Sequence, residues 1–456
     1  MRTANKRIKA ERLVRDAIEK AKFFRDYNIF TSLDEIGAVR RAREIDEAIA
    51  RGEKVGRLAG VPFAVKDNFL VYDEETTASA HILERFDAPL TATSVAKLEA
   101  EGAIVIGRTN LDAFAHGSST ENSYYGPTLN AYDKARVAGG SSGGSAVAVA
   151  LDIVEFATGS DTGGSIRQPA SFNGVYGLKP TYGCISRYGV VAMASSLDCV
   201  GFFTKTPGDM DLLMEITAGQ DTKDLTTLPD YYADSKVPVV KKIGVIKDFD
   251  NDSVDPEIRK ALKKKCEELK EKGYEIVEIT MPALKYALPA YYIIQPAEVA
   301  SNLSRYDGVR YGFRSEKAND LEALYNNTRN EGFMPENKRR IMIGNFVLSS
   351  GFYDAYFLKA AKARTLIIKE YEKAFSEVDF ILMPVSPNPA FKLGEKVNDP
   401  VAMYMEDVMS VSLNLAGVPG LTIPVGKTKK GLPIGLQLVG PRRSDKALIE
   451  FSKELA

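Results

Sequence analysis

Short apolar runs alternate along the chain with longer segments in which apolar residues recur every three or four positions. The short runs are typical of strands, most of them buried on both faces, and they lie at residues 29–33, 61–65, 103–106, 242–246, 275–280, 380–385 and 434–439. The longer segments predict helices at residues 34–51, 93–101, 145–151, 256–272 and 353–375. Strands that alternate with helices over the whole chain predict an α/β fold with a large sheet.

The first 24 residues predict a further helix that packs by one face. Its apolar positions recur at roughly helical spacing, at Ile8, Leu13, Ala17, Ala21 and Phe24. Acidic residues begin at Glu11, which favours a surface helix over a cleaved targeting segment. The longest wholly apolar stretches, such as 146–151, are far shorter than the roughly 18 residues that a membrane-spanning helix needs.

Composition and charge are those of an ordinary globular chain. The 456 residues are 45% hydrophobic and 27% charged, with a net charge of −1. A free-standing nucleic-acid binder would carry a clear basic excess, so this balance argues against that class. The three cysteines, Cys184, Cys199 and Cys266, form no C-x-x-C pair and no disulfide framework, which favours a reducing, cytoplasmic compartment.

Histidine is almost absent, and this narrows the possible chemistry. The two histidines, His81 and His116, are 35 positions apart, so neighbouring histidines cannot build a metal site. We therefore expect no metal bound by this chain. If the chain is an enzyme that uses a nucleophile, its base is expected to be a residue other than histidine.

Glycine is concentrated between residues 139 and 189, where 11 of the 36 glycines fall within 51 positions. Apolar runs interrupt this region, so it differs from a flexible linker, and its glycines indicate tight turns or backbone that approaches a ligand. The region contains neither G-x-x-x-x-G-K-[ST] nor G-x-G-x-x-G, so nucleotide binding has weak support.

Two glycines directly precede Ser165 in this region, which suggests a nucleophile beside an oxyanion hole. A glycine turn can direct consecutive backbone amides at one negative charge, and the candidate donors are the amides of Thr162, Gly163 and Gly164. A buried lysine can replace histidine as the base, because burial lowers its pKa toward neutrality. Lys66 directly follows the buried run 61–65 and is the candidate base.

Three blocks of this sequence resemble the signature blocks of the amidase signature family. They are GVPFAVKDN (60–68), GGSSGGS (139–145) and GSDTGGSIRQPA (159–170), and they separate Lys66 from Ser141 by 75 residues and Ser141 from Ser165 by 24. The resemblance implies a Ser–cis-Ser–Lys triad with Ser165 as the acyl-forming nucleophile, Ser141 as the bridging serine and Lys66 as the base. It also implies that the Gly140–Ser141 peptide bond is cis.

The family resemblance covers nearly the whole chain and implies one amidase domain over residues 1–456. Its expected fold is α/β, with a large central mixed β-sheet covered by helices on both faces. Within it we expect an N-terminal helical segment at about 1–55, a Gly/Ser-rich catalytic core at about 56–210, and a remaining α/β and substrate-pocket part at about 240–456.

Several further segments resemble one branch of the family, the glutaminase subunits of tRNA-dependent amidotransferases. They lie at residues 107–123, 177–198, 301–312 and 338–357. For this branch the resemblance implies that glutamine is the substrate, with Arg340 on its α-carboxylate and Asp407 on its α-ammonium. A tyrosine also contributes, and either Tyr291 or Tyr292 can supply it. At position 116 this chain has histidine where methionine is usual.

The same resemblance implies partners and no cofactor on this chain. Ammonia would pass to a B subunit, which uses ATP and Mg²⁺ and holds most of the tRNA, and a small C subunit would complete a heterotrimer. The acceptor would be Glu-tRNA(Gln), Asp-tRNA(Asn) or both. The alternative is a stand-alone amidase acting on a small organic amide. A non-catalytic scaffold is disfavoured, because such a protein would ordinarily have lost Lys66, Ser141 or Ser165.

Overall fold

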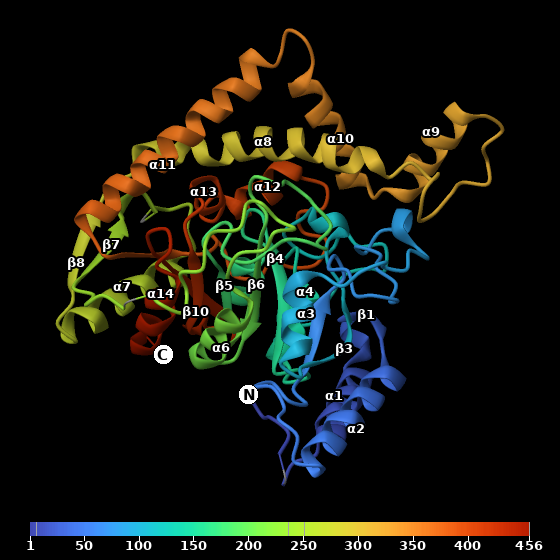
Figure 1. The fold of residues 1–456 in the computed structure, drawn as a ribbon. Helices are drawn as coiled ribbons and strands as arrows, with labels where there is room; N and C mark the ends of the chain where they lie inside the picture. Colours follow the sequence, from blue (N-terminus) through green and yellow to red (C-terminus); the bar gives the residue numbers. More distant parts are fainter. Residues whose placement is uncertain (6, 236, 250, 456) are drawn as a thin grey trace.

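One eleven-stranded sheet runs through the part of the protein that the computed structural model describes, residues 1–5, 7–235, 237–249 and 251–455 (Figure 1). Its strands are β1 (Phe30–Leu33), β2 (Pro62–Lys66), β3 (Ile104–Thr109), β4 (Phe156–Asp161), β5 (Tyr176–Lys179), β6 (Cys199–Thr204), β7 (Lys242–Ile246), β8 (Glu275–Ile279), β9 (Phe380–Pro384), β10 (Gly420–Lys427) and β11 (Pro433–Val439). Their order across the sheet is β1-β3-β2-β4-β6-β5-β10-β11-β9-β7-β8.

The sheet is mixed, as the family resemblance implied. β2 is parallel to β3 and β4, and β7 is parallel to β8 and β9. The remaining pairs, from β4–β6 through β11–β9 together with β1–β3, are antiparallel. Two parallel groups are therefore joined by an antiparallel centre.

Helices cover the sheet and extend beyond it. They are α1 (Ala10–Phe23), α2 (Glu35–Ala50), α3 (Thr93–Ala100), α4 (Gly143–Ala150), α5 (Arg167–Asn173), α6 (Pro207–Thr217), α7 (Pro256–Glu271), α8 (Ala287–Asn302), α9 (Leu321–Gly332), α10 (Pro335–Leu348), α11 (Lys359–Glu377), α12 (Pro400–Tyr404), α13 (Val411–Ala416) and α14 (Asp445–Ser452). In Figure 1, α8, α10 and α11 lie together above the sheet, and α1 and α2 pack side by side at the opposite end.

Successive side chains of a strand belong to different hydrophobic clusters, so both faces of the sheet are buried. On β2, Phe63 and Val65 join the cluster that contains α3, α6, α7 and α14, whereas Ala64 joins the cluster of α1, α2, α4 and α5. On β9, Leu382 faces the first cluster, whereas Met383 packs with α8, α11 and α13. This period-2 alternation is the physical basis of the predicted arrangement of helices on both faces.

Every strand run predicted from the sequence is a strand in the structure, and the predicted helices are present. The helix predicted at 353–375 begins later, at Lys359, because a π-helical turn at Asp354–Leu358 precedes it. The sequence analysis missed β4, β5, β6 and β10 and the helices α5, α6, α8–α10, α12 and α13. The proposed division into three segments stays a prediction.

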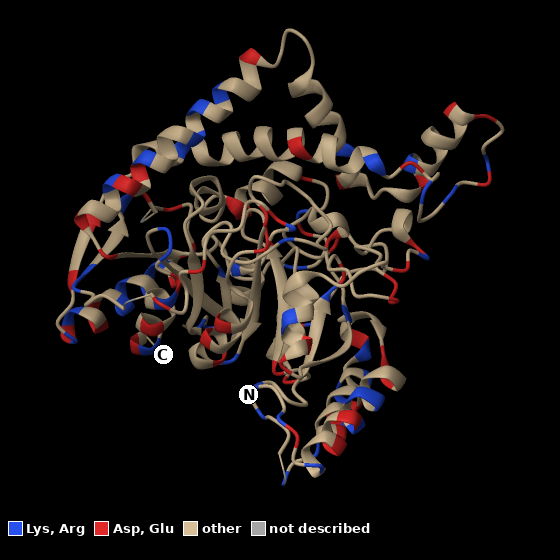
Figure 2. Cartoon of the chain, in the orientation of Figure 1, with Lys and Arg blue, Asp and Glu red and all other residues tan. Residues whose placement is uncertain are grey.

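Charges of both signs are interspersed on the exposed helices α1, α2, α7 and α11, in keeping with the net charge of −1 (Figure 2). Among the described helices, none combines the length and the apolar composition that crossing a bilayer requires.

Candidate active site

Strand β2 delivers Lys66 into the interior, on the same face as α4. The lysine is fully buried, and its Nζ lies 2.8 Å from Ser141 Oγ and 3.0 Å from Ser160 Oγ. Burial lowers the pKa of Lys66 to about 7, so a large part of the amine is neutral at physiological pH and can accept a proton. The next residue, Asp67, pairs with Arg108 at 3.3 Å.

Ser141 lies in the glycine loop that opens α4. The Gly140–Ser141 peptide bond is cis, as the family resemblance implied. A Cβ atom on Gly140 would overlap Asp112 Oδ2, so only glycine fits there. The Asp112 amide donates to the Ser141 carbonyl at 3.2 Å, and Asp112 Oδ2 accepts from the Thr120 amide at 2.8 Å. Buried polar groups thus hold the loop against Lys66.

Ser165 lies beside this loop, in the turn between β4 and α5. The Ser142 amide donates to the Ser165 carbonyl at 3.2 Å. The Ser165 hydroxyl makes no hydrogen bond to any other described residue, and the side chain lines a small cavity. The structure thus joins Lys66 to Ser141 directly and brings Ser165 next to them, with its hydroxyl unengaged.

Asp161 organises the turn that carries Ser165. Its Oδ1 accepts from the Gly164 amide at 2.9 Å, and its Oδ2 accepts from the Ile166 amide at 3.1 Å. Burial opposes ionisation of Asp161, but the adjacent Arg167 guanidinium prevails and lowers its pKa to about 2. Sequence reasoning missed this ion pair.

The engagement of Gly164 corrects one expectation for the oxyanion hole. Because its amide already donates to Asp161, Gly164 is not an available donor in this arrangement. The amides of Thr162 and Gly163 donate no hydrogen bond within the described part of the chain, so they remain the candidate donors.

The residues predicted to hold glutamine gather around the Ser165 cavity. Asp407 and both tyrosines line it, and Tyr291 packs so closely on Gly163 that a Cβ there would lie 2.5 Å from the Tyr291 hydroxyl. The Tyr292 hydroxyl donates to Asp407 Oδ2 at 2.7 Å, and Ser118 Oγ donates to Oδ1 at 2.8 Å. Burial raises the pKa of Asp407 to about 6. The two tyrosines have different contacts, because Tyr291 packs on Gly163 whereas Tyr292 donates to Asp407.

Arg340 lines the same cavity from α10. Its Nε donates to Glu336 Oε1 and its Nη1 to Gln295 Oε1, both at 2.6 Å. The guanidinium carbon lies 4.6 Å from the ring centroids of Tyr292 and Tyr404. Sequence reasoning missed Glu336, although its i,i+4 spacing to Arg340 is a visible signal of a helical ion pair.

A larger cavity adjoins the first. The cavity at Ser165 measures only about 10 Å³, and its neighbour measures about 230 Å³. Gly117, Ser118, Tyr292 and Arg340 line both, so these residues form the boundary between them.

His116 lines the larger cavity and is completely buried. Neither ring nitrogen has a hydrogen-bond partner among the described residues. Burial, assisted by the positive charge of Arg340, lowers the pKa of His116 to about 3, so the ring is neutral. His81 lies elsewhere, stacked on Tyr124, and neither histidine contacts Lys66, Ser141 or Ser165.

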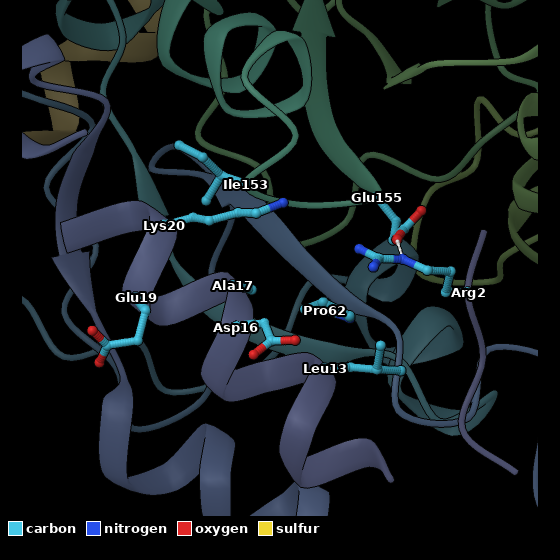
Figure 3. Close-up of a pocket in the computed structure, with 9 residues that line it drawn as sticks. All are labelled: Arg2, Leu13, Asp16, Ala17, Glu19, Lys20, Pro62, Ile153 and Glu155. Atoms are coloured by element: carbon cyan, nitrogen blue, oxygen red, sulfur yellow. Dashed lines mark hydrogen bonds and ion pairs between the residues drawn. The ribbon is translucent and has the colours of Figure 1, made fainter. Parts of the chain in front are cut away.

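A separate cavity of about 280 Å³ lies beside α1 (Figure 3). Its lining includes Pro62, at the opposite end of β2 from Lys66, and an ion pair of Arg2 with Glu155 at 2.8 Å. No predicted site residue lines it. Among the described residues, no group of three or more histidine, cysteine, aspartate or glutamate side chains is placed to hold a metal ion.

Comparison with known proteins agrees with this arrangement. The model of the family described as Amidase matches residues 12–449. The chain therefore belongs to the amidase family, and the resemblance seen in the three sequence blocks is confirmed.

Similar proteins within the family identify the branch to which the chain is most alike. The chain is 48% identical over 432 residues to the A subunit of the glutamyl-tRNA(Gln) amidotransferase of Koribacter versatilis (strain Ellin345), covering 94% of this chain and 90% of that one. It is 51% identical to the corresponding protein of Acaryochloris marina (strain MBIC 11017), covering 88% and 85%. The crystal structure of the corresponding protein from Thermotoga maritima superposes with a TM-score of 0.79 at 38% identity, covering 96% and 90%. These matches confirm the predicted branch of the family and the predicted fold.

Proposed function

We propose that this chain is the glutaminase subunit of a tRNA-dependent amidotransferase, hydrolysing glutamine to glutamate and ammonia. One observation carries the proposal: a buried lysine with a near-neutral pKa contacts Ser141, next to a free Ser165 hydroxyl in a cavity lined by Arg340 and Asp407. The similar amidotransferase proteins support glutamine as the amide and a charged tRNA as the acceptor.

In the proposed mechanism, neutral Lys66 takes the proton of Ser141 as Ser141 takes the proton of Ser165. Ser165 Oγ then attacks the side-chain amide carbon of glutamine, and the amides of Thr162 and Gly163 stabilise the tetrahedral oxyanion. The proton returns through Ser141 to the leaving nitrogen, and ammonia departs, leaving a glutamyl ester on Ser165. Water, activated by Lys66 and Ser141, hydrolyses the ester and releases glutamate.

Two side chains of opposite charge, on different helices, would recognise glutamine. Arg340 would bind the α-carboxylate, and Asp407 would bind the α-ammonium in place of one of its present hydroxyl partners, Ser118 or Tyr292. Both residues line the Ser165 cavity, so the side-chain amide is directed toward the nucleophile.

Ammonia released here would be consumed by a B subunit, which activates Glu-tRNA(Gln), Asp-tRNA(Asn) or both with ATP and Mg²⁺, while a C subunit completes the heterotrimer. The net charge of −1 and the mixed surface charges support a tRNA held mainly by the partner (Figure 2). We propose that this chain itself uses no metal or cofactor, and that it works in the cytoplasm, where translation takes place.

The test is an assay of glutamine hydrolysis and of Glu-tRNA(Gln) amidation by the purified chain, with and without B and C subunits, ATP and Mg²⁺. We expect glutamine-dependent conversion to Gln-tRNA(Gln) in the complete assembly. A chain that ignores glutamine but hydrolyses diverse small amides without partners would instead be a stand-alone amidase.

The state of Lys66 makes glutamine hydrolysis depend on pH. Protonated Lys66 cannot accept a proton, so kcat/KM is expected to rise about tenfold between about pH 6 and pH 8, as the lysine loses its proton around pH 7. Ionisation of Asp407 around pH 6 acts in the same direction. Initial rates across this range measure the profile, and circular dichroism at each pH shows that the protein stays folded. A flat or falling profile would exclude Lys66 as the base.

A further inference from the structure

Arg340 is held by a carboxylate that the reaction scheme does not use. Glu336, one helical turn earlier on α10, accepts from Arg340 Nε through Oε1 at 2.6 Å. Burial alone would favour its protonation, yet the Arg340 charge keeps the pKa of Glu336 below its usual value. Glu336 is therefore a partly buried anion beside the residue proposed to bind the substrate's α-carboxylate.

The same carboxylate organises the aromatic wall of the site. Glu336 Oε1 also accepts from the Tyr404 hydroxyl at 2.8 Å, and the Tyr404 ring stacks on Tyr292 with centroids 4.0 Å apart. Tyr292 in turn donates to Asp407. Glu336 thus connects the two charged groups proposed for substrate recognition through an unbroken series of contacts.

The contacts leave one nitrogen of the guanidinium available. Nε is engaged by Glu336 and Nη1 by Gln295, whereas Nη2 donates to no described residue. Neighbouring side chains bury Arg340, with 3% of its surface exposed, so its orientation depends on these few groups. A guanidinium binds a carboxylate well only when its fork is correctly directed.

We propose that Glu336 is a positioning residue that fixes Arg340, through Nε, with its unengaged Nη2 toward the substrate's α-carboxylate. The proposal rests on the proposed glutaminase function. It predicts that Glu336 governs how well the enzyme recognises the α-carboxylate, and that it leaves the attack by Ser165 unaffected.

The experiment compares Glu336→Ala and Glu336→Gln with the wild type on two substrates. One is glutamine, and the other is 4-aminobutanamide, which is glutamine without its α-carboxylate. For Glu336→Ala we expect KM for glutamine to rise about tenfold with kcat nearly unchanged, which corresponds to about 1.4 kcal/mol of binding. Its kcat/KM on 4-aminobutanamide should stay at the wild-type value. Glu336→Gln keeps an oxygen that can accept from Nε, so it should recover part of the loss.

Lys338→Ala is the matched control, because Lys338 lies on the same helix but donates to the Asn330 carbonyl at 3.0 Å and lines neither cavity. It should behave as wild type. An unchanged or lower KM for glutamine in Glu336→Ala would overturn the proposal, as would an equal loss on both substrates, which would mean general structural damage. Wild type that does not prefer glutamine to 4-aminobutanamide would instead overturn the proposed function.

Discussion

Replacing Ser165 with alanine is expected to lower the rate of glutamine hydrolysis by at least about 10³-fold, or about 4 kcal/mol of barrier. The hydroxyl is unengaged and lies in the cavity with Arg340 and Asp407, so its removal deletes the atom that would form the ester and disturbs no described hydrogen bond. Steady-state release of ammonia measures the effect, and the unfolding temperature of the variant should match that of the wild type.

Ser452→Ala is a suitable control for this variant. Ser452 is also a buried serine, but its hydroxyl donates to the Ile449 carbonyl at 2.6 Å within α14 and has no contact with the site. It should retain wild-type activity. If Ser165→Ala kept more than about a tenth of the activity, the nucleophile would have to be another residue, and the proposed triad would be wrong.

The catalytic candidates could be predicted because their positions depend on local sequence. Lys66 ends a buried strand, Ser141 lies in a glycine loop that opens a helix, and Ser165 follows two glycines, so short blocks determine their backbone settings.

What could not be predicted depends on residues far apart in the chain. The Asp161 carboxylate that engages the Gly164 amide also pairs with Arg167, which bonds to residues 410 and 414 of a distant segment. Helix α8 was missed for a different reason. It contains Pro296 and is apolar on several sides, so it lacks the single apolar stripe by which a surface helix is recognised. The sequence therefore identified the chemistry better than the scaffold that aligns it.

Arg167→Ala is expected to lower the free energy of unfolding by about 3–5 kcal/mol, because it leaves the carboxylate of Asp161 buried without its cation. Both side chains are completely buried, and Arg167 Nη2 lies 2.9 Å from Asp161 Oδ1. Urea denaturation followed by circular dichroism measures the change, since the chain has no tryptophan for fluorescence. The matched control is Arg41→Ala, whose pair with Asp34 at 2.8 Å is partly exposed and should contribute about 1 kcal/mol or less.

The same variant also tests whether Arg167 supports both the stability of the fold and the geometry of the active site. Asp161 holds the turn that carries Ser165, and Arg167 Nη1 donates to the Ser410 carbonyl at 3.0 Å, three residues after Asp407. Loss of Arg167 should therefore loosen the nucleophile and the proposed ammonium site together, so kcat and KM should both worsen in protein that remains folded. Arg167→Lys keeps the charge but cannot reproduce the fork of contacts, and it should fall between wild type and Arg167→Ala. If Arg167→Ala unfolded at the same urea concentration as the wild type, Arg167 would not be needed to stabilise the Asp161 carboxylate. The Ser165 turn would then be held by the hydrogen bonds of that carboxylate to the Gly164 and Ile166 amides alone.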